Sequence, residues 1–156
     1  MRLNSFTDYS LRVLMYLATE PDRRATIAEI AAAFEISRNH LMKVVQFLGQ
    51  QGWLHNVRGR GGGLELACPP ERINLGAVVR AAEGDPLPAE CFDRAHNTCA
   101  IARTCKLRGV LGEAVDAFHA VLDGYTLADI TQDMRPLGQV LKVVQRGLRD
   151  PGGRRS

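Results

Sequence analysis

The fold can be inferred from residues 26–67, which read TIAEIAAAFEISRNHLMKVVQFLGQQGWLHNVRGRGGGLELA. Thr26 and Glu29 have the spacing of a capping box, in which each side chain satisfies an orphan backbone donor at a helix start. Ser37 caps a second helix, which ends before Gly52 because glycine favours helix C-termini. The apolar residues recur every three or four positions in both helices and define their inward faces: Ile27, Ile30, Ala31, Phe34, Leu41, Val44, Val45 and Leu48. Two short helices joined by a tight turn predict a helix-turn-helix.

A β-hairpin is predicted directly after these helices. Residues 53–57 and 64–67 have the composition of strands, and residues 58–63, RGRGGG, form a glycine-rich turn between them. A hairpin in this place is the wing of a winged helix. The loop also resembles a phosphate cradle, but it lacks the lysine and hydroxyl residue and the strand-to-helix context of a P-loop.

The flanking segments predict further helices. Upstream, apolar residues spaced by three and four positions predict a helix that Thr7 caps and that ends near Pro21. Downstream, the proline pair 69–70 breaks the chain, and Asn74 then caps a helix that ends around Gly84.

A long amphipathic helix is predicted over residues 106–122, followed by a short helical turn at 125–130. Its apolar stripe runs for more than four turns and consists of Leu107, Val110, Leu111, Ala114, Val115, Phe118 and Val121. A stripe of this length on a small domain needs a partner to cover it, so we expect a homodimer through this helix.

The predicted fold is therefore mainly α with a small β-wing. We expect a winged helix-turn-helix DNA-binding domain at 1–84, a cysteine-containing loop at 85–105, a dimerisation helix and following turn at 106–132 and a flexible basic tail at 133–156. The 156 residues suit one folding unit, since 46% are apolar and 24% charged. No apolar run approaches the roughly 20 residues of a membrane span, so we expect a cytoplasmic protein without an export signal.

The charge is distributed unevenly along the chain. Residues 37–63 contain four basic residues and no Asp or Glu, whereas residues 64–132 contain ten acids against six bases. A cationic segment of this kind favours a phosphate backbone, because each neutralised phosphate releases counterions. The predicted DNA contacts lie in the first two turns of the second helix and in the wing: Ser37, Arg38, Asn39, His40, Lys43, Arg58 and Arg60. The alternative is a solvated helix face.

Three of the four cysteines are closely spaced, as Cys91-x7-Cys99-x5-Cys105. In a reducing compartment such spacing indicates metal or redox chemistry rather than disulfides. Loops of this length can aim several thiolates at one inorganic centre, such as an iron–sulfur cluster. Zinc sites usually contain a C-x2-C pair, which is absent here. Three unrelated thiols remain the alternative.

Four features together resemble the winged-helix family of iron–sulfur regulators, and within it the nitric-oxide-sensitive transcriptional repressors. They are residues 1–12 (MRLNSFTDYSLR), residues 37–45 (SRNHLMKVV), residues 57–64 (VRGRGGGL) and the three cysteines. The similarity covers about residues 1–135 in register. It implies a homodimeric repressor that binds inverted-repeat operators of nitrosative-stress genes on double-stranded DNA and releases them when nitric oxide attacks its cluster.

The resemblance also implies the ligands of this cluster, with a 4Fe-4S form favoured over 2Fe-2S. Cys91, Cys99 and Cys105 match the three cysteine ligands of the family. Asp8 matches an aspartate that in one branch completes the cluster from the partner subunit. A carboxylate holds iron less firmly than a thiolate does, which leaves one iron open to a small diatomic ligand. Otherwise Asp8 serves only as a negative charge near a helix N-terminus.

Other fourth ligands and other functions stay open. The branch that regulates cluster biogenesis uses a histidine just after the last cysteine, where this chain has residues 106–108, KLR. His96 and Cys68 are further candidate ligands. A regulator of cluster biogenesis or iron status differs in its signal, and a zinc or thiol protein would bind DNA constitutively. An enzyme is disfavoured, since no paired nucleophile and base, cofactor fingerprint or carboxylate pair is present.

Overall fold

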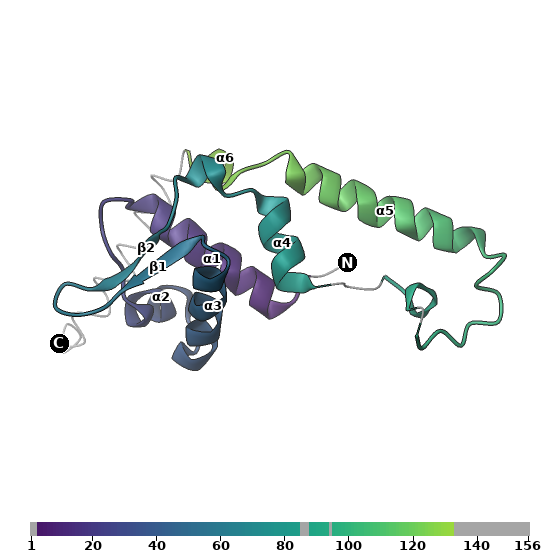
Figure 1. Cartoon of the computed structure of the whole chain (residues 1–156), viewed down its shortest axis with the longest axis horizontal. Helices are drawn as coiled ribbons and strands as arrows, with labels where there is room; N and C mark the ends of the chain where they lie inside the picture. Colours follow the sequence, from purple (N-terminus) through teal and green to yellow (C-terminus); the bar gives the residue numbers. More distant parts are fainter. Residues whose placement is uncertain (1–2, 85–87, 94, 133–156) are drawn as a thin grey trace, which may run out of the picture.

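The structure is a computed structural model of the chain and describes residues 3–84, 88–93 and 95–132. Its α-helices are α1 (Ser5–Thr19), α2 (Ile27–Phe34), α3 (Arg38–Gln50), α4 (Leu75–Glu83), α5 (Lys106–Asp123) and α6 (Leu127–Thr131). Strands β1 (Leu54–Val57) and β2 (Gly63–Leu66) form an antiparallel hairpin, and η1 (Pro70–Arg72) and η2 (Glu90–Phe92) are short 3-10 turns. Figure 1 shows α1–α4 and the hairpin gathered in one body, from which α5 projects. The predicted mainly helical winged-helix architecture is confirmed.

The core lies between α1, α2, α3 and the base of the hairpin, and Ile73, Val78 of α4 and Leu127 of α6 complete it. Val13 and Leu14 of α1 are fully buried against inward-facing residues of the other elements. All four predicted inward residues of α3 are buried, from Leu41 to Leu48. Burying each such aliphatic side chain contributes roughly 1.5–3 kcal/mol. This core holds α3 so that its opposite face is left in solvent.

Helix α1 begins earlier than the sequence predicted. Its N-cap is Asn4 rather than Thr7, and the Asn4 side chain accepts a hydrogen bond from the Thr7 backbone N–H at 2.8 Å. Asparagine is at least as good a cap as threonine, and capping from position 4 adds most of a helical turn. Thr7 consequently lies inside the first turn and is fully buried.

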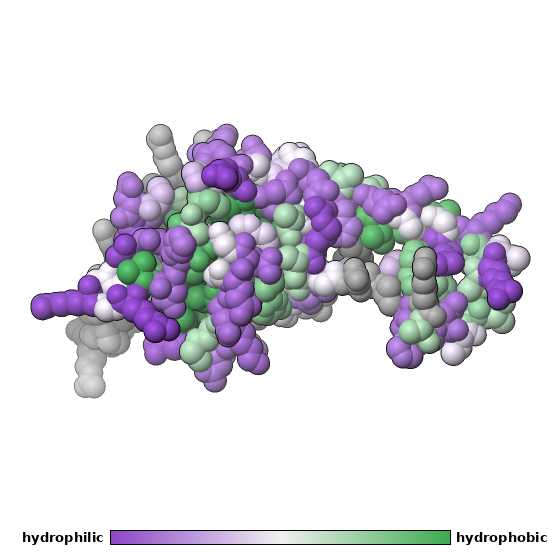
Figure 2. Space-filling view, in the orientation of Figure 1, coloured by the Kyte–Doolittle hydropathy of each residue, from purple (hydrophilic) through white to green (hydrophobic). Residues whose placement is uncertain are grey.

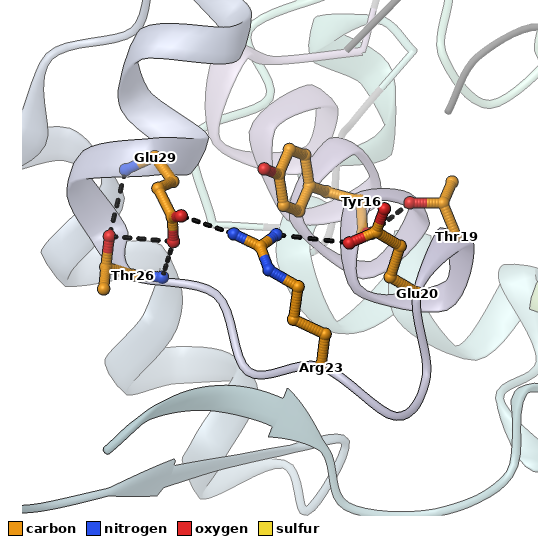
Figure 3. A network of polar contacts seen from close by, with 6 residues as sticks. All are labelled: Tyr16, Thr19, Glu20, Arg23, Thr26 and Glu29. Carbon is orange, nitrogen blue, oxygen red and sulfur yellow. Dashed lines mark hydrogen bonds and ion pairs between the residues drawn. The ribbon is translucent and has the colours of Figure 1, made fainter. Parts of the chain in front are cut away.

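The predicted capping box of α2 is present, and it belongs to a larger network of polar contacts. The backbone N–H of Thr26 donates to the Glu29 carboxylate at 2.7 Å, and Glu29 N–H donates to the Thr26 hydroxyl at 3.2 Å. Figure 3 shows Arg23 reaching both Glu29 and Glu20, so that one guanidinium joins the end of α1 to the start of α2. The network therefore fixes the turn that leads into the helix-turn-helix.

Glu29 is expected to make stability dependent on pH. Burial disfavours its charge, but the hydrogen bond from Thr26 and the Arg23 guanidinium outweigh burial and lower its pKa from 4.5. A lowered folded-state pKa stabilises the protein above the unfolded-state pKa, and this contribution is lost as the pH falls through the folded-state value. Urea unfolding should show that Glu29→Ala costs about 1–2 kcal/mol at pH 7.

Glu29→Gln is the control for this prediction. Glutamine can still accept the capping bond but carries no charge, so this variant should lose less stability than Glu29→Ala and should be less sensitive to acid than the wild type. Equal acid sensitivity of Glu29→Gln and the wild type would contradict the role of the Glu29 charge.

The two strands of the wing are paired from its base onward, and a glycine turn joins them at its tip. Leu54 pairs with Leu66 and Val57 with Gly63, while Arg24 donates to Glu65 at 2.6 Å across the base. At the tip, a Cβ at Gly62 would lie 2.3 Å from the Val57 carbonyl oxygen, so only glycine fits there. The predicted turn thus requires glycine at position 62 because of the close backbone approach, whereas Gly59 and Gly61 adopt positive φ values of 98° and 79°.

The C-terminal elements agree closely with the prediction. Helix α5 covers Lys106–Asp123, and none of its residues is buried. Thr126 caps α6 through a capping box with Asp129, and α6 then packs Leu127 into the core. The predicted flexible tail at 133–156 lies outside the described residues. Within the described part of the chain, no helix combines the length and apolar character that a membrane crossing requires.

Candidate DNA-binding face and cysteine loop

The N-terminal half of α3 presents the predicted DNA contacts to solvent. The Ser37 hydroxyl caps the helix by accepting a hydrogen bond from the His40 N–H at 3.4 Å. Since Leu41 and Val44 point inward, the residues between and before them point outward. The exposed positions on α3 and its cap include Ser37, Arg38, Asn39, His40 and Lys43. A row of donors on one exposed face is suited to base edges and phosphates in the major groove.

The wing presents two more cations. Arg58 and Arg60 are exposed in the turn between β1 and β2, and hydrophilic side chains cover the end of the hairpin at the left of Figure 2. Within the part of the chain that the structure describes, no acidic group lies within 4.0 Å of either arginine, nor of Arg38 or Lys43. Among the described residues, these four cations are therefore not neutralised by ion pairs.

The first turns of α1 border this face, which sequence reasoning missed. The Tyr9 ring stacks on the His40 imidazole with a centroid distance of 6.4 Å. A hollow of about 280 Å³ opens beside them, and it is lined by Ser5, Phe6, Tyr9, His40, Lys43 and Val44. The sequence shows Tyr9 only as one apolar member of the α1 pattern, because the stack joins residues on two different helices.

The cysteine loop is shaped by local side-chain hydrogen bonds. Glu90 accepts a bond from the Thr98 N–H at 2.7 Å, and its hydrogen bonds from the Thr98 hydroxyl and N–H lower the pKa of its carboxyl. The Asp93 carboxylate contacts His96 Nδ1 at 2.9 Å, and this contact, together with backbone N–H donors, lowers the pKa of Asp93. Because Glu90 and Thr98 adjoin Cys91 and Cys99 in sequence, the first bond closes the loop between these two cysteines.

The three predicted cysteine ligands are free thiols, each half-buried. Cys105 occupies the N-cap position of α5 without making a side-chain cap bond. Among the described residues, no three or more His, Cys, Asp or Glu side chains stand close enough together to hold a metal ion. The donor chemistry thus suits an iron–sulfur centre, but in the single chain the three thiols are not gathered at one point.

The candidates for a fourth ligand have other contacts in the structure. Asp8 forms an ion pair with Arg12 at 2.9 Å, and its side chain is 42% exposed. His96 is held by Asp93, although its side chain is 83% exposed. Cys68 packs against the core beside the hairpin, as expected for a small packing residue. The residues just after Cys105 belong to α5 and include no histidine in its first turns.

Comparison with known proteins agrees with this geometry. The family model Rrf2, described as an iron-dependent transcriptional regulator, matches residues 3–133. The HTH-type transcriptional regulator NsrR of Bacillus subtilis (strain 168) is 49% identical over 144 residues, covering 92% of this chain and 99% of that protein. NsrR of Geobacillus kaustophilus (strain HTA426) is 46% identical over 143 residues, covering 91% and 97%.

Solved structures share the fold. The oxidised form of Staphylococcus aureus CymR superposes with a TM-score of 0.67 at 25% identity and covers 84% of this chain and 96% of that chain. IscR of T. potens has a TM-score of 0.70 at 22% identity, covering 88% and 90%, which is a likeness of fold alone. The curated relatives are transcriptional regulators and not enzymes, which confirms that expectation for this chain. The chain belongs to the Rrf2 family of iron-dependent transcriptional regulators.

Proposed function

We propose that this chain is a homodimeric repressor that binds an inverted-repeat operator and releases it when nitric oxide reacts with an iron–sulfur cluster on each subunit. The observation that carries the proposal is the exposed cationic face formed by Arg38 and Lys43 of α3 and by Arg58 and Arg60 of the wing, which have no acidic partners among the described residues. The similarity to regulators named NsrR supports the choice of signal.

Each subunit reads DNA with two elements. Helix α3 lies in the major groove, where Arg38, Asn39 and Lys43 contact base edges and Ser37 and His40 complete the interface. The arginines of the wing reach the adjacent minor groove or its phosphates, where the narrow groove has a strongly negative potential. The Tyr9 ring limits the rotation of His40 by stacking on it.

The cluster is held by thiolates of Cys91, Cys99 and Cys105, and the Glu90–Thr98 contact favours this arrangement by bringing the chain on either side of Cys91 and Cys99 together. A bound cluster, for which we favour the 4Fe-4S form, supplies an iron that reacts with nitric oxide. Asp8 of the partner subunit is the fourth ligand. To serve in that role, Asp8 must leave its ion pair with Arg12. This ion pair is weak, because both side chains are half-exposed.

Dimerisation uses the exposed apolar side of α5. The side chains of Leu107, Val110 and Val121 are 61%, 59% and 62% exposed, and with Ala114 they follow the spacing of a coiled-coil seam. Leu111, Val115 and Leu122 are half-buried on the neighbouring side. Pairing two copies of α5 would cover the seam and place the two α3 helices about 34 Å apart, one turn of DNA.

Arg38→Ala and Lys43→Ala are expected to weaken operator binding by about 1–3 kcal/mol where the residue reads a base edge, and by less where it contacts only phosphate. Titrations at several salt concentrations distinguish the two cases, because loss of a phosphate contact lowers the salt dependence. Arg72→Ala is the matched control, since Arg72 is an exposed cation at the end of η1, outside both α3 and the wing. If both α3 variants bound the operator with unchanged affinity, α3 would not be the recognition helix.

A regulator of iron–sulfur cluster biogenesis is the second candidate, and the iron dependence of the family favours it. The two candidates differ in the signal. Purified holoprotein should be exposed separately to nitric oxide and to oxygen while its visible absorption and operator binding are followed. Loss of binding with nitric oxide at stoichiometric amounts, without a comparable effect of oxygen, supports the first candidate.

A further inference from the structure

The C-terminal end of α5 is joined to α4 by an unusually close contact. We propose that Gly76, Arg80 and Asp123, here called the clamp, set the angle of α5 and thereby the spacing between operator half-sites that the dimer accepts. The proposal rests on the proposed function, because it concerns how two DNA-reading units are held apart. It assigns a positioning role to three residues that touch neither DNA nor the cysteine loop.

The clamp is built on the Asp123 carboxylate. Arg80 donates to it from its two terminal guanidinium nitrogens, Nη1 at 3.0 Å and Nη2 at 2.6 Å. This two-point geometry fixes the direction of the guanidinium as well as its distance, which a single contact would not. The backbone carbonyl of Asp123 also accepts a bond from the Asn74 side chain at 2.7 Å. Asp123 is therefore tied to the start and to the last turns of α4.

Gly76 allows the two helices to approach this closely. It is buried, and a Cβ at this position would lie 1.9 Å from Asp123 Oδ1 and 3.0 Å from the Asp123 backbone N. No side chain fits at this position while the Asp123 carboxylate stays where Arg80 holds it. The requirement is steric, since the Asp123 carboxylate occupies the space in which any side chain would begin and the Asp123 backbone N lies close by.

Backbone hydrogen bonds beyond the clamp also connect the start of α4 to the segment that follows α5. The N–H of Leu75 donates to the Tyr125 carbonyl at 3.0 Å, and the N–H of Leu127 donates to the Ile73 carbonyl at 2.8 Å. These hydrogen bonds join residues 73–76 to residues 123–127. Within these two segments, Ile73 and Leu127 are fully buried. The end of α5 is anchored to the winged helix, while Figure 1 shows its other end far from α1–α3.

Helix α5 acts as a lever about this anchor. It contains 18 residues, which at 1.5 Å per residue make it about 27 Å long. A change of roughly 10° at the clamp would move the far end by about 5 Å, more than the 3.4 Å between successive base pairs. Because the dimer seam lies along α5, the clamp angle determines where each α3 sits relative to the dimer axis.

The test is operator binding as a function of spacer length. The probe is the inverted repeat that wild-type holoprotein selects from a random duplex library, with the spacer then shortened or lengthened by one and two base pairs. Two base pairs rotate one half-site by about 70°, so wild-type affinity should fall at least about tenfold. Asp123→Ala should lose less than about threefold across the same series, with its affinity for a single half-site unchanged.

Two further variants make the test decisive. Asp116→Ala removes an exposed carboxylate two turns earlier on the polar side of α5 and should keep the wild-type spacing preference. Asp123→Asn keeps the shape of the side chain and serves if Asp123→Ala does not fold, with an intermediate loss of preference expected. Full wild-type preference in the folded Asp123 variants would overturn the clamp. A wild type that is indifferent to spacing would instead overturn dimeric reading of an inverted repeat, and the role of the clamp with it.

Discussion

Replacing Cys91, Cys99 or Cys105 by alanine is expected to abolish iron retention while leaving the winged helix folded. The core of α1–α3 contains none of these cysteines, so the far-ultraviolet circular dichroism and the thermal unfolding of the DNA-binding body should change little. Two thiolates and a carboxylate from another subunit do not hold a cluster well, because thiolate is the ligand that such clusters prefer. Iron and sulfide per chain after anaerobic purification should fall to near zero.

Operator binding should weaken together with iron loss. Without the cluster, no common ligand connects the three cysteines of the loop. Asp8 of the partner subunit then keeps its ion pair with Arg12. The resulting change in subunit arrangement should lower DNA affinity by about 5- to 150-fold, the usual range of coupling between two sites. Nitric oxide applied to the wild type should cause the same loss.

Cys68→Ala is the matched control, because Cys68 is a free thiol that packs against the core and lies outside the loop. It should keep iron, sulfide and operator affinity at wild-type levels. Asp8→Ala should keep a cluster on the three thiolates but lose it faster or respond differently to nitric oxide. If the apo protein and the cluster-loaded protein bound the same operator with equal affinity, the proposed sensor function would be wrong.

Placing a lysine at Val110 is expected to separate the dimer and reduce operator affinity by a hundredfold or more. Val110 is 59% exposed on the apolar side of α5. Twofold symmetry would bring two copies of the new charge into one seam, where neither has a partner. A monomer binds only one half-site and loses the avidity of the second contact, which is commonly worth a factor of 10² to 10⁴.

Sedimentation at micromolar concentration should show a monomer for Val110→Lys and a dimer for the wild type. Asp116→Lys is the matched control, since it adds the same side chain on the polar side of α5, and it should remain dimeric. A wild type that is monomeric with and without its cluster would exclude dimerisation through α5. If the Val110→Lys variant remained a dimer, the dimer interface would not include this side of α5.

The helix-turn-helix and wing could be predicted from the sequence because their determinants are local. The capping box of Thr26 and Glu29, the cap at Ser37 and the glycine run before Leu64 each act within a few residues, and all three are present in the structure. The start of α1 shows the limit of local reasoning. Asn4 and Thr7 are both good caps, and the choice between them depends on packing of the first turn against the core.

The residue types of the candidate site were also evident in the sequence, but their arrangement was not. Three closely spaced cysteines indicate a metal centre, yet the described part of a single chain does not gather three ligands. The fourth ligand that the family resemblance implies, Asp8, would come from the first helix of the partner subunit. A shared site depends on the assembly, which the order of residues in one chain does not specify.

Local sequence patterns were enough to predict the helices, the polar face of α3 and the residues that carry the charges and thiols, because propensity, capping and periodicity act over a few residues. The stacking of Tyr9 on His40 and the contacts of Asp123 with Gly76 and Arg80 became evident only in the folded chain. These pairs are separated by tens of residues. They meet because the core brings α1 onto α3 and the end of α5 onto α4, and no local pattern encodes that packing.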